Sequence, residues 1–188
     1  MRVIAGSARS IVLQTPKGMQ TRPTSDRIKE TLFNILQPRL YGAVFADFFA
    51  GSGGIGIEAL SRGASKAVFV DRDRDSLRCI THNLEKTGLA EQAQVIAGDV
   101  TVAMKRLEGR VCFDIVFIDP PYQAGLEEKV FDFLGRSSII DENSLIILEA
   151  DSRRQTDFCE QYGFNIERTK VYGSNQHIFM RKKGTNAC

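Results

Sequence analysis

The sequence predicts a single domain of 188 residues with a doubly wound α/β fold. From Ala43 onwards, short apolar segments alternate with amphipathic segments, which is the pattern of parallel strands joined by helices. A composition of 43% hydrophobic and 26% charged residues is enough for the core of one globular domain. The last two apolar segments are joined only by residues 172–176, so we expect them to form an antiparallel pair.

The expected elements follow this alternation. Residues 1–40 form an extension, with a short hairpin around Gly6 and a helix that is capped by Ser25 and ends before Pro38. Residues 41–183 are expected to form the core of the domain, and 184–188 a tail. The expected strands cover 43–50, 66–70, 94–97, 111–118, 144–149, 164–171 and 177–181, and the expected core helices cover 55–62, the segment around Leu77, Ile80 and Leu84 up to Gly88, 126–134 and 155–162.

Composition argues against several classes of protein. No uncharged apolar segment approaches the ~18 residues that a membrane helix needs, and no apolar region typical of a signal peptide follows Met1. The two histidines have no partner at metal-ligand spacing, and the cysteines do not form a C-x-x-C pair. We therefore expect a cytoplasmic protein without a metal and with reduced thiols at Cys79, Cys112, Cys159 and Cys188.

The formal net charge is +2, but the charge is distributed unevenly. Residues 1–30 contain six Lys/Arg and two Asp/Glu, a net charge of +4, and residues 168–188 contain five Lys/Arg and no acid, a net charge of +5. Residues 31–167 therefore carry −7. Basic ends on an acidic body suggest a polyanionic partner that is contacted by the termini, although solvated surface charge gives the same pattern.

The most informative segment is the acceptor motif, Asp119-Pro120-Pro121-Tyr122. It follows the apolar segment 111–118, which predicts a buried strand. Neither proline has a backbone N–H, so the motif offers hydrogen-bond acceptors at the Asp119 carboxylate and the Pro120 carbonyl. Phosphate sites need N–H donors instead. Acceptors beside the ring of Tyr122 suit a planar group that donates through an NH2, such as a nucleobase, whereas the simpler alternative is a Pro-Pro turn.

A second motif predicts a nucleotide cofactor. The expected strand 43–50 contains Asp47 and runs into the glycine loop, residues 51–56, which fits G-x-G-x-x-G. The next strand ends at Asp71, 20 positions after Gly51, which is the spacing of a carboxylate that binds a ribose. A strand before the loop, a helix after it and an acid in place indicate an adenosine-containing cofactor. A tight turn that only packs a helix on a sheet is the alternative.

These features are expected to meet at one edge of the sheet. In an open parallel sheet, ligands bind beyond the carboxyl ends of the strands where the strand order reverses. If the Asp47 strand is the first and the Asp119 strand the fourth, they are neighbours at that point. Asp99 follows the third strand, where it could contact an adenine amine or cap the next helix.

Together these residues resemble the class I S-adenosylmethionine-dependent methyltransferases. Within that class, the chain is closely similar to the bacterial 16S ribosomal RNA guanine-N2 methyltransferases of the small subunit, the RsmD family. The similarity covers nearly the whole chain, and Asp71 is a small departure because glutamate is usual there. The most specific segments are Arg22-Pro23-Thr24 with Arg27, residues 30–34, 48–53, 56–64, 119–122 and Tyr172-Gly173.

The resemblance implies a seven-stranded sheet with a reversed last strand and a role for each motif. It implies that S-adenosylmethionine is bound with its methionine end at Asp47, Gly51 and Gly53, its ribose at Asp71 and its adenine near Asp99, under a loop containing Arg22 and Thr24. It implies that Asp119, Pro120, Pro121 and Tyr122 bind the target base. The expected product is N2-methylguanine at position 966 of 16S ribosomal RNA.

The expected partner is 16S ribosomal RNA within the small subunit or an assembly intermediate, bound by a monomer without membrane or metal. The cations expected to contact RNA are Arg2, Arg9, Lys17 and Arg22. Two alternatives stay open. A DNA adenine-N6 or other amine methyltransferase shares the acceptor motif, although 188 residues leave little room for a target-recognition segment. An NAD-dependent oxidoreductase or a non-catalytic nucleotide-binding module shares the glycine loop but gives no reason for Asp119.

Overall fold

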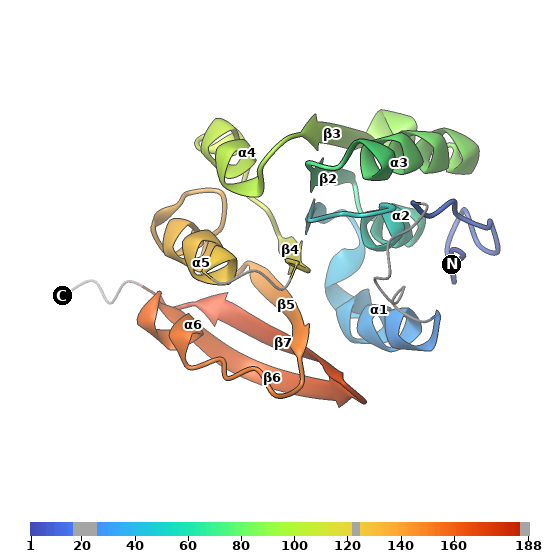
Figure 1. Cartoon of the computed structure of the whole chain (residues 1–188). Helices are drawn as coiled ribbons and strands as arrows, with labels where there is room; N and C mark the ends of the chain where they lie inside the picture. Colours follow the sequence, from blue (N-terminus) through green and yellow to red (C-terminus); the bar gives the residue numbers. More distant parts are fainter. Residues whose placement is uncertain (17–25, 122–124, 185–188) are drawn as a thin grey trace. The chain divides into compact units, whose positions relative to one another are not determined.

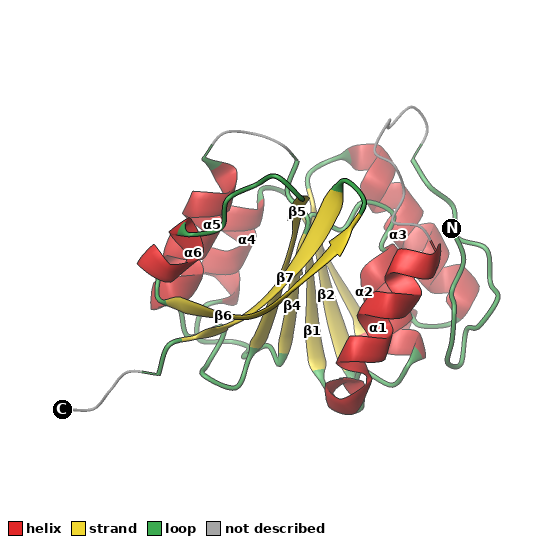
Figure 2. Cartoon of the chain, turned by 90° about the horizontal axis from the view of Figure 1, so that it is seen from below, coloured by secondary structure: helices red, strands yellow, loops and turns green. Residues whose placement is uncertain are grey.

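A computed structural model describes residues 1–16, 26–121 and 125–184 of the chain (Figure 1). The chain divides into two compact units, residues 1–99 and 100–188, and each is described by itself. Strands and helices alternate in both units, as the sequence predicts (Figure 2). Among the described residues, no helix combines the length and the apolar character needed to cross a membrane.

The first unit contains three parallel strands in the order β3-β2-β1. Helix α2 contacts β1 and β2, and α3 contacts β2 and β3. The strands β1 and β2 are almost entirely buried and supply the apolar core, whereas β3 is largely exposed. The elements of this unit are α1 (Asp26–Leu40), β1 (Val44–Phe48), α2 (Gly54–Ser61), β2 (Lys66–Asp71), α3 (Arg74–Thr87), a 3-10 turn (Ala90–Gln92) and β3 (Ala93–Ala97).

The second unit contains four strands in the order β4-β5-β7-β6. Strands β4 and β5 are parallel, β7 is antiparallel to both β5 and β6, and β6 and β7 form the long hairpin seen in Figure 2. The antiparallel final pair predicted from the short connection is therefore confirmed. The elements are α4 (Val100–Leu107), β4 (Ile115–Ile118), α5 (Leu126–Arg136), β5 (Leu145–Asp151), α6 (Phe158–Gln161), β6 (Phe164–Tyr172) and β7 (Asn175–Lys182).

Some element boundaries differ from those expected. The strand predicted over residues 111–118 is shorter in the structure, where β4 begins at Ile115. Before it, the Phe113 amide donates to the Ile139 carbonyl (2.8 Å) and Asp114 is exposed. Helix α1 continues past Pro38 to Leu40, which is possible because proline has a helical φ and loses only one hydrogen bond. Helix α6 has only four residues, fewer than the 155–162 expected.

The predicted N-terminal hairpin is wrong as a pair of strands but right as a pairing of segments. Arg2 and Val12 form a single antiparallel bridge. Backbone hydrogen bonds link Val3 to Ile11 (2.9 Å) and Leu13 to Met1 (3.0 Å) on either side of it. Residues 1–16 pack along α2 and α3 instead of continuing a sheet, because their amides bond to side chains of those helices.

The Glu58 cluster links three parts of the first unit. The carboxylate of Glu58 on α2 is fully buried and accepts from four donors. The backbone amides of Ile4 (2.8 Å) and Ala5 (3.0 Å) come from the N-terminal segment. The Lys29 ammonium of α1 lies 3.1 Å from it, and the Arg62 guanidinium lies 2.7 Å away. All four acceptor positions of the carboxylate are therefore filled.

Lys29 is also buried, and its only described ionic partner is Glu58. The ammonium donates to the Arg2 carbonyl at 2.6 Å. Burial lowers the pKa of Lys29, and the Glu58 charge opposes that shift. The guanidinium of Arg62 packs over the Phe33 ring at 5.2 Å. The buried face of α1 carries Lys29 among the apolar residues Leu32, Phe33, Leu36 and Leu40.

We expect Glu58→Gln to lower the free energy of unfolding by about 3–5 kcal/mol, because it leaves the buried Lys29 ammonium without a counter-ion. Urea unfolding followed by circular dichroism measures this change. Glu85→Gln on the exposed side of α3 is the matched control and should leave stability nearly unchanged. A loss below about 1 kcal/mol for Glu58→Gln would show that the ion pairs contribute little.

Candidate cofactor and base-binding sites

The backbone after β1 adopts an unusual conformation in the glycine loop. Gly51 and Gly53 have positive φ angles of 55° and 77°, and Phe49 has a φ of 67°. A positive φ is costly for a bulky residue and is usually found where the surrounding structure enforces it, often at functional sites. Here the amides of Phe49 and Ala50 both donate to the Val70 carbonyl (3.0 Å each), which links the loop to β2.

Asp71 at the end of β2 holds this loop in place. One carboxylate oxygen accepts from the Gly51 amide (2.8 Å), and the other accepts from the Asp73 amide (2.9 Å). A carboxylate has about four acceptor positions, so the two bonds leave room for two more donors. The predicted ribose-binding residue therefore also fixes the glycine loop, which the spacing alone did not indicate. Asp73 in turn caps α3 by accepting from the Ser76 amide (2.9 Å).

The three glycines of the motif have different roles. A Cβ added to Gly51 would meet no atom within 4 Å, so open space lies beside this backbone. A Cβ on Gly56 would lie 2.3 Å from the Phe69 ring, so this glycine allows α2 to pack on β2. Gly53 is intermediate, because a Cβ added there would lie 3.3 Å from the Ile80 side chain. Gly51 is therefore the position where a ligand can approach the backbone, as a cofactor requires.

Asp47 on β1 is buried below the loop, with 2% of its surface exposed. Its carboxylate accepts from the Gly56 amide at 2.8 Å, in the first turn of α2. Burial raises the pKa of Asp47 to about 7; the Gly56 hydrogen bond opposes this shift, and the nearby Asp71 charge adds to it. Near neutral pH this carboxyl group therefore gains or loses a proton in response to a nearby charge.

Asn83 supports the loop from α3, and the sequence analysis missed it. The buried side chain donates to the carbonyls of Ser52 and Gln14 (2.9 Å each) and accepts from the Gln14 amide (2.8 Å). It therefore joins the glycine loop to the N-terminal segment. A polar residue on the apolar face of α3, three positions after Ile80, was the only signal in the sequence.

The acceptor motif follows β4 in the second unit. All four residues of β4 are buried, and the chain reaches the surface immediately afterwards, with Asp119 exposed, Pro120 buried and Pro121 exposed. An exposed carboxylate at the carboxyl end of a buried parallel strand is in the position predicted for a base-binding residue. Tyr122 lies outside the described residues. That the motif shares one crevice with the glycine loop stays a prediction.

The remaining predicted residues are distributed as follows. Asp99 is exposed after β3, immediately before α4. Arg2 is exposed and pairs with Asp26 at 3.1 Å, and Arg9 is exposed. Lys17, Arg22 and Thr24 lie outside the described residues. Within the described ranges, no group of three or more His, Cys, Asp and Glu side chains could hold a metal ion.

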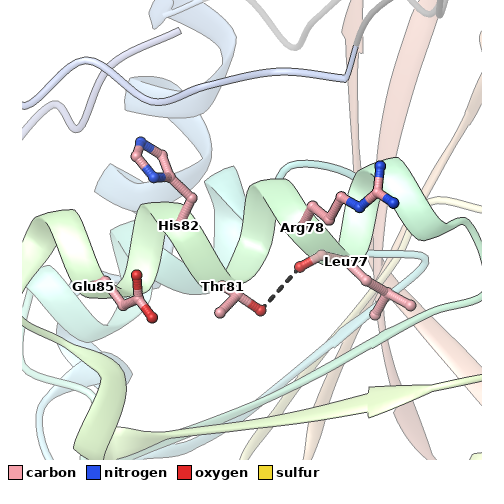
Figure 3. A pocket seen from close by; sticks show the side chains of 5 residues that line it. All are labelled: Leu77, Arg78, Thr81, His82 and Glu85. Atoms are coloured by element: carbon pink, nitrogen blue, oxygen red, sulfur yellow. Dashed lines mark hydrogen bonds between the residues drawn. The ribbon is translucent and has the colours of Figure 1, made fainter.

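A shallow pocket on the outer side of α3 is separate from these residues. It is lined by Leu77, Arg78, Thr81, His82 and Glu85, all from one helix (Figure 3). The Thr81 hydroxyl donates to the Leu77 carbonyl at 3.0 Å, so its polar group is used within the helix. Because a single helix forms this surface, it lacks the convergent groups of a ligand site.

Comparison with known proteins agrees with the predicted fold class. The solved structure of a putative methyltransferase, yhhF from Escherichia coli, has a TM-score of 0.84 and 31% identity over 98% of this chain and 99% of its own. The putative methylase HI0767 from Haemophilus influenzae has a TM-score of 0.80 and 31% identity over 97% of this chain and 98% of its own. The predicted α/β methyltransferase fold, with seven strands that are mostly parallel and antiparallel at the end, is confirmed.

Similar sequences define the family. Ribosomal RNA small subunit methyltransferase D of Escherichia coli K12 is 38% identical over 92% of this chain and 85% of its own length. The putative rRNA methyltransferase YlbH of Bacillus subtilis is 36% identical over 98% of this chain and 100% of its own length. The family model described as "Conserved hypothetical protein 95" matches residues 1–181. The chain therefore belongs to this family, that of the ribosomal RNA small subunit methyltransferase D proteins, as the sequence resemblance predicted.

Proposed function

We propose that this protein transfers the methyl group of S-adenosylmethionine to the exocyclic N2 of one guanine in the RNA of the small ribosomal subunit. By resemblance the target is the guanine at position 966 of 16S ribosomal RNA. The observation that carries the proposal is the exposed Asp119 carboxylate beside Pro120, at the end of a buried strand, in a chain 38% identical to a small subunit methyltransferase D. The protein acts as a cytoplasmic monomer without a metal, on the small subunit or an assembly intermediate.

The residues of the first unit fit S-adenosylmethionine. The open space at Gly51 allows the ligand to approach the backbone, and Asp71 keeps two acceptor positions for the ribose hydroxyls. By resemblance, Asp47 and Gly51–Gly53 would hold the methionine end and Asp99 the adenine, and Arg22 and Thr24 would also bind the cofactor. When bound, the cofactor supplies an electrophilic methyl group on a sulfonium, so the protein has mainly to orient the two reactants.

The acceptor motif would prepare the guanine nitrogen for attack. The N2 lone pair is delocalised into the ring, which makes the amine a poor nucleophile. The Asp119 carboxylate and the Pro120 carbonyl can accept its two N–H bonds and turn the lone pair towards the methyl carbon. Tyr122 would stack on the base after it leaves its RNA context. Alignment of this kind is worth roughly 7–11 kcal/mol in favourable cases.

Both the charge and the proton are accounted for in this methyl transfer. Methyl transfer would form the N–C bond as the C–S bond breaks, which would leave neutral S-adenosylhomocysteine and a positively charged nitrogen on the base. That nitrogen loses a proton to Asp119 or to water. Since the exposed Asp119 is within reach of solvent, the proton can leave the site without a buried relay.

The substrate is tested by incorporation of a tritiated methyl group. We expect small-subunit particles from a strain lacking this protein to be labelled much better than naked 16S RNA, and duplex DNA not at all. The net positive charge lies at the chain ends, so recognition depends on the shape of a folded particle and should weaken steeply with salt. Mass spectrometry of the nucleosides must identify N2-methylguanine. Labelled adenine in DNA would point to the other amine methyltransferases, and equal labelling of naked RNA would remove the particle requirement.

The acceptor motif should matter for chemistry and not for the cofactor. Asp119→Ala is expected to abolish methyl transfer while S-adenosylmethionine affinity stays within about twofold, because the proposed role of this carboxylate is to contact the base and not the cofactor. Tyr122→Phe should keep substantial activity and Tyr122→Ala should not, since stacking needs the ring. Single-turnover assays and isothermal calorimetry measure the two effects, with the exposed Glu142→Gln as the control. Wild-type turnover in Asp119→Ala would refute the role of this carboxylate.

Substitution of Gly51 should mainly affect ligand binding, whereas substitution of Gly56 should mainly affect packing. Gly51→Ala adds a methyl group in the open space that the cofactor would use, so S-adenosylmethionine binding should weaken about tenfold or more. The positive φ costs the fold only about 1–2 kcal/mol. Gly56→Ala forces a clash with Phe69 and should mainly lower the melting temperature. Calorimetry and thermal unfolding distinguish these outcomes, and normal cofactor affinity in a folded Gly51→Ala variant would place the ligand elsewhere.

Asp47 should make stability and cofactor binding depend on pH in opposite directions. Its pKa is about 7 in the folded protein against 3.8 for the ordinary carboxyl group. The folded state therefore favours the protonated form, and its stability falls as pH rises from about 4 to 7. Bound ammonium and sulfonium charges favour the ionised form, so S-adenosylmethionine should bind more tightly as pH rises through 7. Calorimetry on wild type and Asp47→Asn tests this, and parallel pH profiles would contradict it.

A further inference from the structure

A buried polar cluster lies at the carboxyl end of β5 in the second unit and has no role in the reaction described above. The Glu149 carboxylate on β5 accepts from the Asn175 amide at 2.9 Å. Its other oxygen lies 3.2 Å from Nε2 of His177 on β7, the residue paired with it across the two strands. Glu149 is 7% exposed and His177 is fully buried. A buried pair of this kind adds little stability compared with apolar residues.

The cluster also contains polar atoms without partners. In the part of the chain that the structure describes, Nδ1 of His177 and the hydroxyl of Tyr172 are buried without a hydrogen bond. The two rings are in contact, with centroids 5.1 Å apart. Each Glu149 oxygen has one described donor, so two of its four acceptor positions remain. Buried polar atoms are nearly always satisfied, so this cluster has the capacity to bind another polar group.

The register places Glu149 beside the acceptor motif within the same unit. Ile118 at the end of β4 is paired with Leu148 on β5, so Asp119 and Glu149 are the next residues on two adjacent parallel strands. Neighbouring strands lie about 4.8 Å apart. The Phe117 ring contacts the His177 ring edge-on at 5.9 Å, so Phe117 and the cluster lie on one face. Side chains alternate along a strand, so we expect Asp119, the first residue after β4, to lie on the same face as Phe117.

We propose that Glu149 accepts the N1–H of the target guanine and thereby selects guanine over bases that lack this hydrogen. The inference rests on the proposed function and extends it to substrate specificity. The Watson–Crick edge of guanine presents N2–H2 and, next to it, N1–H. Asp119 and Pro120 accept from N2, so the N1–H needs one further acceptor from a neighbouring strand. In adenine N1 is itself an acceptor, which a second carboxylate repels.

The other members of the cluster hold Glu149 for this purpose. Asn175 and His177 bind its two oxygens from one side and fix the carboxylate orientation. Tyr172 is close enough for the Glu149 charge to contribute to its raised pKa, of which burial is the main cause and which Arg168 opposes. The Tyr172 hydroxyl therefore keeps its proton and can act as a donor to the bound base or to a water molecule. Asn175 and His177 are therefore positioning residues.

The test compares particles that carry guanine or 2-aminopurine at the target position. 2-Aminopurine keeps the 2-amino nucleophile, but its N1 has a lone pair in place of the hydrogen. We expect the wild-type protein to methylate the guanine particle on the order of 10–100-fold faster in kcat/KM, as for a lost hydrogen bond to a charged group. Equal rates on the two particles would overturn the proposal without the use of any variant.

Glu149→Gln provides the second arm, because its amide N–H can donate to the unprotonated N1. In this variant the preference for guanine over 2-aminopurine should become smaller or reverse. Because 2-aminopurine lacks O6 with either protein, such a change reports on the loss of N1–H and not on the loss of O6. Glu142→Gln, exposed in the turn before β5, is the matched control and should keep the wild-type ratio. An unchanged ratio in an active Glu149→Gln protein would also overturn the proposal. If that variant does not fold, equal wild-type rates on the two particles still overturn the proposal.

Different outcomes reject the proposed methyltransferase function and the role of Glu149. If the wild-type protein labels neither particle, the proposed function itself is rejected, and the specificity role falls with it. If it labels both particles equally at the 2-amino group, the methyltransferase proposal stands and only the role of Glu149 is wrong. Binding of S-adenosylmethionine to each variant, measured by calorimetry, verifies that the first unit is intact.

Discussion

The buried Glu58 carboxylate is the constraint on which the first unit depends. Burying a carboxylate is costly unless every acceptor position is used, and here two amides, an ammonium and a guanidinium use them. Because these donors come from the N-terminal segment, α1 and α2, none of the three can shift without leaving a buried charge unpaired. The glycine loop leads directly into α2, so the helix that this cluster fixes is the one that follows the loop.

Carboxylates near the ends of the strands organise the structure around them and also keep lone pairs that a ligand can use. Asp71 and Asp47 accept amides of the glycine loop and of α2, so they organise backbone first and can bind a ligand with what remains. Glu149 is likewise held from one side, by Asn175 and His177. In each case the hydrogen bonds within the protein fix the orientation of the carboxylate and leave some of its lone pairs available. A rigid element can prepare a site in this way before the ligand arrives.

The elements predictable from sequence were those set by local pattern. Apolar segments gave β1, β2 and β5, and Gly88, with a φ of 70°, ends α3 as its position suggested. The motif spacing gave Asp71. Partners of long-range contacts were not predictable, because Lys29 and Asn83 resemble ordinary surface residues of a helix until the segments they meet are known. The acceptor motif was identified by its chemistry, but the length of β4 was not, because the hydrogen bond that precedes the strand joins Phe113 to the distant Ile139.

Asn83 has a consequence for how the chain responds to its ligands. One side-chain amide spans the Ser52 carbonyl of the glycine loop and the Gln14 carbonyl of the segment that leads towards Arg22. The two backbones therefore share a single hydrogen-bonding group and lose freedom together. A ligand that orders one of them reduces the entropy cost of ordering the other. By thermodynamic reciprocity, two ligands that order these two segments would promote each other's binding by the same factor.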